Sequence, residues 1–319
     1  MNSFLIKTIS ILLVLIHTGN IQAAYPDKPI HIIVPYAPGG GVDVVARIMA
    51  IKLQDKFKQS VIVENRPGAA GMIAAQFLTR SEPNGYTLMI DTISITMNPS
   101  LNKKIPYNPS NILPIAKLIS LPFVVAVNSA IPVKNLNELI EYIKINPTKT
   151  NLAMAGSSTR FAAELFKLST GTDFTMVSYQ GAAPTVMSLV SGSTQFSVID
   201  LPSIAQQISN GKVRVLATTT KKRIESLPST LTTPELGFND FVISSWYGIF
   251  APIGTNQEIV KLLNDEFNRI IALPDVLEKF KAMGAEADAI TQEEFRQLYL
   301  NDINRWRDVV TKSNMVISE

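Results

Sequence analysis

Three consecutive glycines, residues 39–41, stand between an apolar run and a segment with helical periodicity. The run, residues 30–34, predicts a strand, and the apolar positions from Val44 onward predict a helix with Asp43 as its cap. Glycines at such a turn let a ligand approach the backbone closely, and the first N–H groups of a helix have no intrahelical partner. Those donors and the positive end of the helix dipole favour an anion. The turn therefore predicts an anion-binding site.

The spacing of these glycines excludes the two common nucleotide fingerprints. It is not G-x-G-x-x-G, and the pattern G-x-x-x-x-G-K-[ST] does not occur in the chain. The anion therefore need not be a phosphate. The alternative interpretation is a plain connection, because glycine turns are common between elements.

A second loop, in the middle of the chain, repeats this arrangement with more hydroxyl groups. An expected strand ends before Gly156, and Ser157, Ser158 and Thr159 stand at the start of an expected helix. One hydroxyl is enough to cap a helix, so a run of three offers more than capping needs. Arg160 follows, where a positive charge opposes the helix dipole, and it indicates either an anionic partner or a plain surface arginine. The two loops predict the two sides of a cleft.

The first 24 residues are typical of a secretory signal peptide. Lys7 provides the positive charge, residues 9–16 are apolar, and cleavage is expected near Ala23 or Ala24. The apolar run is too short to span a bilayer, which disfavours the alternative of an uncleaved anchor. Because the chain contains no cysteine, lipid attachment and disulfides are excluded. We expect an exported, soluble protein without a lipid anchor.

The alternative function for the serines is catalysis, in a periplasmic hydrolase that uses Ser157 or Ser158. A nucleophilic serine needs a positioned base, and His31, inside the first expected strand, is the only histidine after residue 24. A Ser–Lys arrangement stays open, although no S-x-x-K lies near the glycine loops. With no cysteine and no carboxylate spacing typical of zinc, we expect no metal and no cofactor. The sequence favours a binding protein over an enzyme.

The size and charge of the chain indicate how many domains it has and which partners are disfavoured. The chain has 319 residues, which exceeds the usual size of a single core and predicts two domains. Its 29 basic and 26 acidic residues leave a formal net charge of +3. So small a charge argues against nucleic acid as a partner, and no polybasic run favours a membrane surface.

Short β-rich runs alternate with helical patterns along the rest of the chain, which predicts an α/β fold with largely parallel sheets. In open sheets of this kind, ligands bind beyond the carboxyl ends of strands. The expected strands are residues 30–34, 61–64, 87–91, 123–128, 152–155, 175–178, 195–199, 213–218 and 245–250. Three expected helices begin with the residue pairs of a capping box, namely Asn135 with Glu138, Thr255 with Glu258, and Thr291 with Glu294.

Several segments also carry a family resemblance. The chain resembles the periplasmic solute receptors of the tripartite tricarboxylate transporters, the Bordetella uptake gene family. The matching segments are YPDKPIHIIVPYAPGGGVDVVAR (residues 25–47), VIVENRPGAAG (61–71), PNGYTLMI (83–90), NPSLNKKIPYNP (98–109), AGSSTRFAAELFK (155–167), VSYQGAAPTVMSLVSG (177–192), GKVRVLATTTKKR (211–223) and SWYGIFAPIGT (245–255). They cover nearly all of the chain after residue 24, in the order and spacing of the family.

The resemblance implies a two-domain periplasmic-binding-protein-like fold of type II. Each domain would be a mostly parallel sheet flanked by helices, and two crossover strands would join the domains. The first domain would comprise residues 25–124 plus 248–319, and the second residues 125–247. The residues alone indicate only a single division near residue 125, so the discontinuous first domain comes from the resemblance.

The resemblance also implies the ligand contacts of the first domain. The loop after the first strand looks like the carboxylate loop of the family, with Tyr36, Pro38, Gly40 and Gly41 as contacts. Asp43 matches as well, although its expected role as helix cap is favoured over ligand contact. Thr92 follows a strand at a position where the family has a pocket residue.

In the second domain, the resemblance implies contacts from three loops. These are Gly156, Ser157, Ser158, Thr159 and Arg160 in the first loop, Tyr179 and Gly181 in the second, and Asp200 in the third. Histidine is common in the family where this chain has Arg160, and this difference leaves the identity of the ligand open. For Asp200, an amino group, a bound water and the hinge all remain possible partners.

The implied function is a receptor that captures a small carboxylate between two domains and delivers it to the membrane subunits of a transporter. A dicarboxylate, a tricarboxylate, an amino acid or an aromatic acid would each suit such a site. A sensor that passes the ligand signal to another protein is the alternative. We expect a monomer whose domains close over the ligand, with Gly248 as a hinge residue. Trp246 would lie in the second crossover strand, and Trp306 in a helix core insensitive to closure.

Overall fold

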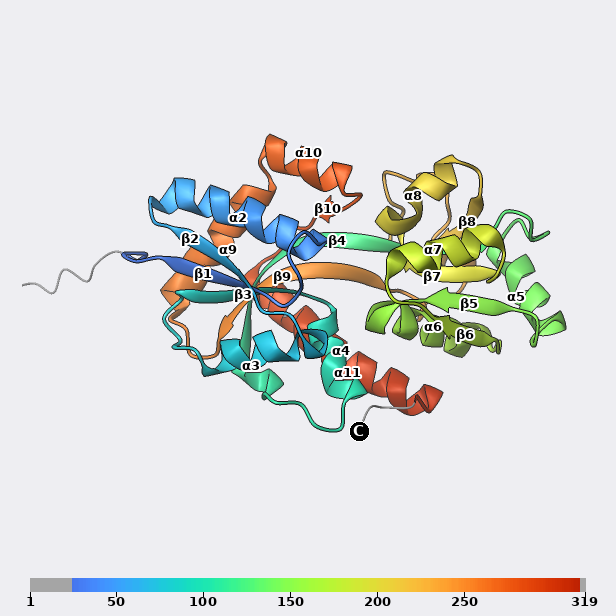
Figure 1. The fold of residues 1–319 in the computed structure, drawn as a ribbon, viewed down its shortest axis with the longest axis horizontal. Coiled ribbons are helices and arrows are strands. Elements are labelled where there is room, and N and C mark those ends of the chain that lie inside the picture. Colours follow the sequence, from blue (N-terminus) through green and yellow to red (C-terminus); the bar gives the residue numbers. More distant parts are fainter. Residues whose placement is uncertain (1–24, 316–319) are drawn as a thin grey trace, which may run out of the picture.

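The computed structural model describes residues 25–315. The expected signal peptide, residues 1–24, lies outside the described residues. Figure 1 shows two lobes side by side, connected by two long strands, β4 (Ile112–Asn128) and β9 (Ser244–Pro252). Between residues 25 and 315, no helix has the length and apolar character needed to cross a membrane.

The first lobe contains both ends of the described chain. Its strands β1 (Ile30–Val34), β2 (Val61–Asn65) and β3 (Thr87–Thr92) are parallel, in the order β2-β1-β3. Strand β9 is antiparallel to β3 and to β4, and the short β10 (Glu286–Ala287) is antiparallel to β4. The helices of this lobe are α2 (Gly41–Phe57), α3 (Met72–Arg80), α4 (Ser94–Leu101), α9 (Gln257–Ile271), α10 (Pro274–Ala282) and α11 (Gln292–Ser313).

The second lobe repeats this plan. Its strands β5 (Asn151–Met154), β6 (Thr175–Ser178) and β7 (Phe196–Asp200) are parallel, with β5 in the middle. Strands β7 and β8 (Val213–Thr218) are antiparallel to the second half of β4. The helices are α5 (Leu136–Ile145), α6 (Gly156–Thr170), α7 (Ala182–Ser191) and α8 (Leu201–Ser209).

These pairings confirm an α/β fold, with parallel strands inside each lobe and antiparallel pairs where β4, β8, β9 and β10 join. One apolar cluster packs α2, α9 and α10 on one face of the first sheet, and another packs α7 and α8 on one face of the second. The largest cluster extends through both lobes, because it contains apolar residues of α3, α4 and α11 as well as of α5 and α6. The two lobes therefore share part of their core.

The first crossover strand is much longer than the sequence predicted. Only residues 123–128 were expected, whereas β4 begins at Ile112. Nearly every residue of β4 is buried, so it lacks the alternation that marks a strand with one exposed face. Pro114, Lys117 and Pro122 also interrupt the apolar run that would mark a buried strand.

One of the three expected capping boxes is complete in the structure, that of Thr291 with Glu294. Asn135 caps α5 by accepting the backbone N–H of Glu138, but the Glu138 carboxylate accepts the backbone N–H of Lys134 rather than that of Asn135, so this box is only half formed. The prediction for Thr255 is wrong, because Asn256 caps α9 by accepting the N–H of Glu258. The Thr255 hydroxyl instead donates to the carbonyl of Pro252 at 2.8 Å. An Asn one position along can supply the cap equally well, and the local pattern does not separate the two.

Gly248, expected as a hinge residue, has a packing role in the structure. It lies in the middle of β9, opposite Asp91 of β3 and Lys117 of β4. A Cβ at this position would lie 2.2 Å from Cζ of Phe295 in α11, which is far too close for any real contact. The missing side chain therefore makes room for a buried aromatic ring, and the hinge role stays a prediction.

Candidate ligand-binding cleft

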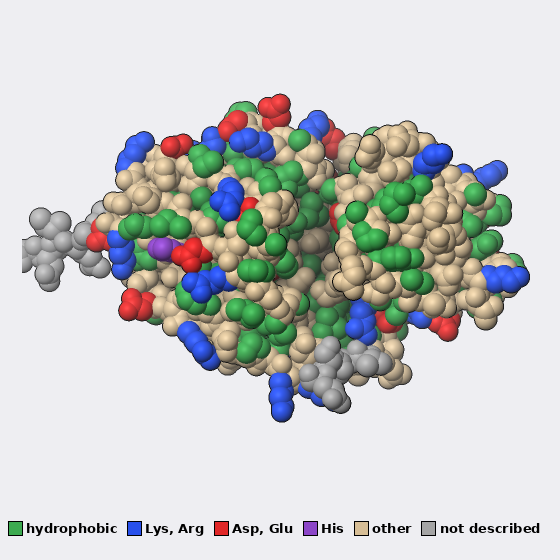
Figure 2. Space-filling model, in the orientation of Figure 1, with side chains coloured by type: hydrophobic (Ala, Val, Ile, Leu, Met, Phe, Trp, Pro, Cys, Tyr) green, Lys and Arg blue, Asp and Glu red, His purple; other side chains and the backbone are tan. Residues whose placement is uncertain are grey.

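Figure 2 shows a deep groove between the two lobes. Loops from both lobes meet there, because the carboxyl ends of β1 and β3 face those of β5, β6 and β7 across it. The hydroxyl oxygens of Ser94 and Ser157, one from each lobe, lie 3.3 Å apart. A Cβ placed on Gly284 would lie 3.0 Å from Cγ of Pro202. Gly284 of the first lobe and Pro202 of the second therefore also lie close together.

The glycine turn of the first lobe has the predicted strand–turn–helix arrangement. Gly40 is the N-cap of α2, with extended backbone angles of φ −76° and ψ 167°, and no side chain caps the helix. A Cβ on Gly40 would have a single heavy atom within 4 Å, the carbonyl oxygen of Ala37 at 3.8 Å. Pro38, Gly40 and Gly41 are exposed in this turn. The space in front of the first turn of α2 is open to a small anion.

Asp43 does not cap this helix as the sequence predicted. Its Oδ2 accepts the backbone N–H of Gly39 at 3.0 Å and Nε of Arg47 at 2.9 Å. Its Oδ1 accepts Nη2 of Arg47 at 3.0 Å and Nδ2 of Asn65 at 2.9 Å. The hydrogen bonds from Arg47 are the main reason that the pKa of Asp43 is lowered to about 2. Both oxygens of Asp43 are therefore engaged with groups of the first lobe, which hold the turn in place, and ligand contact by Asp43 stays a prediction.

Tyr36 and Thr92, predicted separately, lie side by side. The Tyr36 hydroxyl donates to Oδ1 of Asp91 at 3.0 Å and is 3.1 Å from Oγ1 of Thr92. The backbone N–H of Thr92 donates to the same Asp91 oxygen at 2.7 Å. Burial raises the pKa of Asp91 to about 7. Burial also raises the pKa of the Tyr36 hydroxyl, and the neighbouring Asp91 carboxyl raises it further. Asp91 was not predicted as a site residue; an acidic side chain at the end of an apolar strand was its only signal.

In the second lobe, α6 begins at Gly156, whose φ of +73° favours glycine. The Thr159 hydroxyl accepts the backbone N–H of Ala155 at 2.8 Å and donates to its carbonyl at 2.6 Å. The expectation that one of the three hydroxyls caps the helix is wrong, because Ala155 is the N-cap and no side chain caps α6; Thr159, inside the first turn, bonds back to Ala155 instead. Ser157 reaches across to the first lobe, and Ser158 is partly exposed beside it.

The remaining predicted residues lie at helix starts of the same lobe. Arg160 lies in the first turn of α6 and is partly exposed. Tyr179 follows β6 and is held by its backbone N–H, which donates to the carbonyl of Met154 at 2.9 Å. Gly181, with φ +104°, is the N-cap of α7, and no side chain caps that helix. Asp200 is the N-cap of α8.

Tyr247 is a cleft residue that the sequence analysis missed. It lies in β9 opposite Thr92 of β3, and its hydroxyl oxygen is 3.2 Å from the position that a Cβ on Gly41 would occupy. Burial, followed by the charge of Asp200, raises the pKa of Tyr247 to about 12. Adjacent residues of a strand face opposite sides, so its neighbour Trp246 points into the core while Tyr247 points to the cleft.

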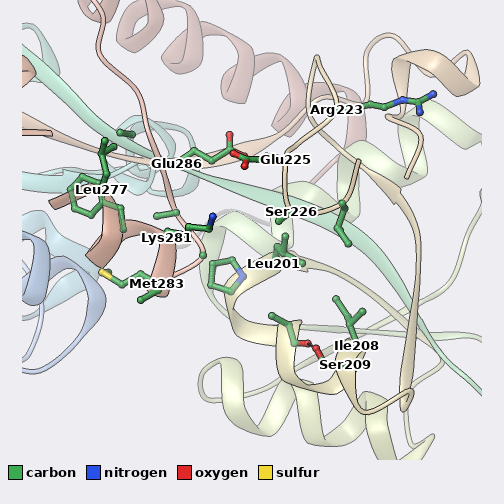
Figure 3. Close-up of a pocket in the computed structure, with 18 residues that line it drawn as sticks. Leu201, Ile208, Ser209, Arg223, Glu225, Ser226, Leu277, Lys281, Met283 and Glu286 are labelled. Atoms are coloured by element: carbon green, nitrogen blue, oxygen red, sulfur yellow. Dashed lines mark hydrogen bonds between the residues drawn. The ribbon is translucent and has the colours of Figure 1, made fainter. Parts of the chain in front are cut away.

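A cavity of about 880 Å³ opens between the lobes, with α8 on one side and α10 on the other. Figure 3 shows Leu201 and Met283 among the side chains that line it. Leu201 directly follows Asp200, and Cε of Met283 is 3.8 Å from the Cβ position on Gly41. None of the predicted ligand contacts lines this cavity, which neighbours the predicted site only through Leu201 and Met283.

His31 is not placed to act as a base for Ser157 or Ser158. His31 lies near the start of β1, at the edge of the sheet opposite the glycine turn, and its Nδ1 is 2.5 Å from Oε1 of Glu64. Within residues 25–315, no group of three or more His, Cys, Asp or Glu side chains is placed to hold a metal ion. The cleft offers backbone N–H groups and neutral hydroxyls, which is the chemistry of binding an anion.

Comparisons with known proteins agree with this chemistry. The profile described as tripartite tricarboxylate transporter family receptor matches residues 45–315. The chain is 33% identical to Protein BugT of Bordetella pertussis, over 96% of this chain and 97% of that protein. A structure of R. palustris Rpa4515 with adipate is 29% identical, with a TM-score of 0.77, and covers 91% of this chain and 98% of its own. MatC from Rhodopseudomonas palustris with bound malate is 28% identical, with a TM-score of 0.74, and covers 90% of this chain and 100% of its own.

Proposed function

The chain belongs to the receptor family of the tripartite tricarboxylate transporters, and we propose that it captures a small carboxylate between its lobes and delivers it to the membrane subunits of a transporter. The family consists of periplasmic binding proteins rather than enzymes, which confirms the expectation of a receptor. Export with cleavage near Ala23 or Ala24, and a monomeric state, are part of this proposal.

One observation carries the proposal: helix starts from both lobes, at Gly41, Gly156 and Ala182, face one groove without a side-chain cap. Charge-assisted hydrogen bonds contribute roughly 1.5–3 kcal/mol each. A micromolar dissociation constant needs about 8 kcal/mol. Four to six such bonds from the paired helix starts contribute roughly 6–18 kcal/mol before the cost of ordering, so bonds in the upper part of this range supply micromolar affinity without a formally charged clamp.

The related structures support a carboxylate as the ligand. Rpa4515 was solved with adipate and MatC with malate, both dicarboxylates. We propose a ligand among the di- and tricarboxylates, amino acids and aromatic acids. We also propose the domain limits 25–124 plus 248–319 and 125–247, which are supported by the passage of β4 and β9 from one lobe to the other.

Refolded protein is expected to bind at least one small carboxylate, with one site per chain. The experiment unfolds the protein to remove any retained ligand, refolds it, and screens organic acids and amino acids by thermal shift and calorimetry. Binding should raise the melting temperature in proportion to the logarithm of ligand concentration above the dissociation constant. A protein that binds only neutral sugars or cations would rule out the proposal.

Closure of the lobes over the ligand is part of the proposal, and Trp306 is the better reporter of it. Trp246, in the crossover strand β9, is buried, and its Nε1 donates to Oδ2 of Asp302 in α11 at 3.0 Å. The Trp306 ring, 5.0 Å from the ring of Phe161 in α6, lies between the lobes. We therefore expect Trp306, rather than Trp246 of the crossover strand, to report closure of the lobes.

In a Trp246→Phe variant, the bound carboxylate should change the Trp306 emission, and small-angle scattering should give a smaller radius of gyration. The ligand favours the closed arrangement only through the extra contacts it makes there. The matched control is Trp306→Phe, whose remaining Trp246 emission should stay constant. An unchanged radius of gyration at saturating ligand would show that the cleft is rigid.

A further inference from the structure

The hydroxyl of Tyr247 is placed to meet the ligand carboxylate. It lies beside the first turn of α2, because Gly41 has no Cβ that would crowd it. Among residues 25–315, no protein group forms a hydrogen bond with this hydroxyl. A phenol with a pKa of about 12 keeps its proton at neutral pH and therefore remains a donor.

Asp200 approaches the same place from the second lobe. Its Oδ1 accepts the backbone N–H of Ser203 at 3.1 Å and the Ser203 hydroxyl at 2.6 Å, which caps α8. Within the described part of the chain, Oδ2 has no such partner and remains an acceptor. Pro202, two residues after Asp200, is 3.0 Å from the Cβ position on Gly284, and the adjacent Met283 lies with the Tyr247 hydroxyl beside Gly41. The start of α8 therefore faces the Tyr247 side of the groove, and the charge of Asp200 adds to burial in raising the pKa of Tyr247.

The start of α2, the Tyr247 hydroxyl and the Asp200 carboxylate suit different groups of a ligand. The start of α2 and the Tyr247 hydroxyl donate hydrogen bonds and suit carboxylate oxygens. Oδ2 of Asp200 repels a second negative oxygen and suits a hydroxyl or an ammonium group. Leu201, next to Asp200, and Met283, next to Gly41, line a cavity that lies beside these groups.

We infer that the ligand of this cleft is a carboxylic acid with a hydrogen-bond donor, a hydroxyl or an amino group, next to the carboxylate. The Tyr247 hydroxyl donates a hydrogen bond to the carboxylate, and Asp200 accepts one from the neighbouring hydroxyl or amino group. This inference rests on the proposed function and narrows its ligand class, since a plain dicarboxylate offers Asp200 nothing to accept.

The test compares acids of equal length that differ only in this donor. The three series are propionate, lactate and alanine; succinate, malate and aspartate; and glutarate, 2-hydroxyglutarate and glutamate. In the series that binds best, the acid with the donor should bind about 10- to 100-fold more tightly than the plain acid, as measured by calorimetry. The hydroxy and amino members separate the two kinds of donor.

The outcomes distinguish this inference from the function on which it rests. If plain acids bind as tightly as their substituted partners in every series, the inference is wrong and the carboxylate receptor stands. If no acid in these series or in the wider screen binds, both are wrong.

Two variants assign the roles to residues. Asp200→Asn keeps the oxygen that caps α8 and replaces the free acceptor with a donor, so the preference for the substituted acid should fall to about 1. Tyr247→Phe should weaken both members of a series by the same factor, about 10-fold. The controls are Asp308→Asn on the exposed face of α11 and Tyr142→Phe on α5, and both should bind as the wild type does.

An Asp200→Asn variant that keeps the full preference would overturn the role of Asp200. A Tyr247→Phe variant with unchanged affinity for every acid would overturn the role of Tyr247. Circular dichroism and the melting temperature of each variant show whether it is folded, so a lost preference cannot be confused with a lost fold.

Discussion

Replacing Gly40 by valine is expected to weaken carboxylate binding by about 100-fold or more while the protein remains folded. The backbone of Gly40 is extended, with φ −76° and ψ 167°, which valine adopts without strain. The only heavy atom within 4 Å of its Cβ would be the Ala37 carbonyl oxygen at 3.8 Å. The added side chain therefore fills the open space before α2, where the carboxylate needs the backbone donors.

Calorimetry with the acid that binds wild type best measures this loss. Gly40→Ala adds only the Cβ and should lose less affinity than valine. Ala130→Val, in an exposed turn of the second lobe, controls for the added bulk and should bind normally. If Gly40→Val binds as the wild type does, the glycine turn is a connection and not a ligand site.

The wild type is expected to lose stability as the pH rises from 4 to 7, because burial disfavours the ionised form of Asp91. Replacing Asp91 by asparagine is expected to remove this loss. Burial raises the pKa of Asp91 from 3.8 to about 7 in the folded protein. Between these values, the folded state retains a proton that the unfolded chain has released, so the free energy of unfolding falls as the pH rises. The full difference corresponds to roughly 4 kcal/mol at 1.36 kcal/mol per pKa unit.

The measurement is urea unfolding of both proteins from pH 4 to pH 8. Asparagine keeps the oxygen that accepts from Tyr36 and from the backbone of Thr92, so it replaces the charge and little else. The stability of the variant relative to wild type should increase steadily with pH and level off above pH 7. Asp302, whose pKa is raised to about 6, is present in both proteins and cancels from the difference.

Asp308→Asn, an exposed residue of α11, is the control and should show no such trend. A stability difference between wild type and Asp91→Asn that does not change with pH would contradict the prediction. In that case, Asp91 would be ionised in the folded protein, and water or a cation would have to reach it.

The sequence determined the parts of the site that depend on neighbouring residues. The strand before the glycine turn, the start of α6 at Gly156 and the capping box at Thr291 and Glu294 were all predicted. Each depends on contacts within a few residues, where backbone preference and unpaired N–H groups decide the structure. The α/β class follows in the same way from the alternation of short strands and helices.

Local patterns failed where two neighbouring residues compete for one role or where burial removes the pattern. Asp43 and Thr255 were both suitable caps, yet Gly40 and Asn256 occupy the N-cap positions. The first half of β4 is buried on both faces and shows no alternation. In each case the outcome depends on how the chain packs against other elements.

Only the tertiary structure decided which distant groups meet. It places the Tyr247 hydroxyl beside Gly41, and the Phe295 ring packs where Gly248 has no side chain. Trp306 packs against Phe161 of the other lobe. These partners are far apart in the sequence, and their contact depends on the crossing of β4 and β9 and on the packing of α11 beneath both lobes. Hydrophobic periodicity shows that a face is buried, but not which face it will meet, because many apolar surfaces satisfy the same burial.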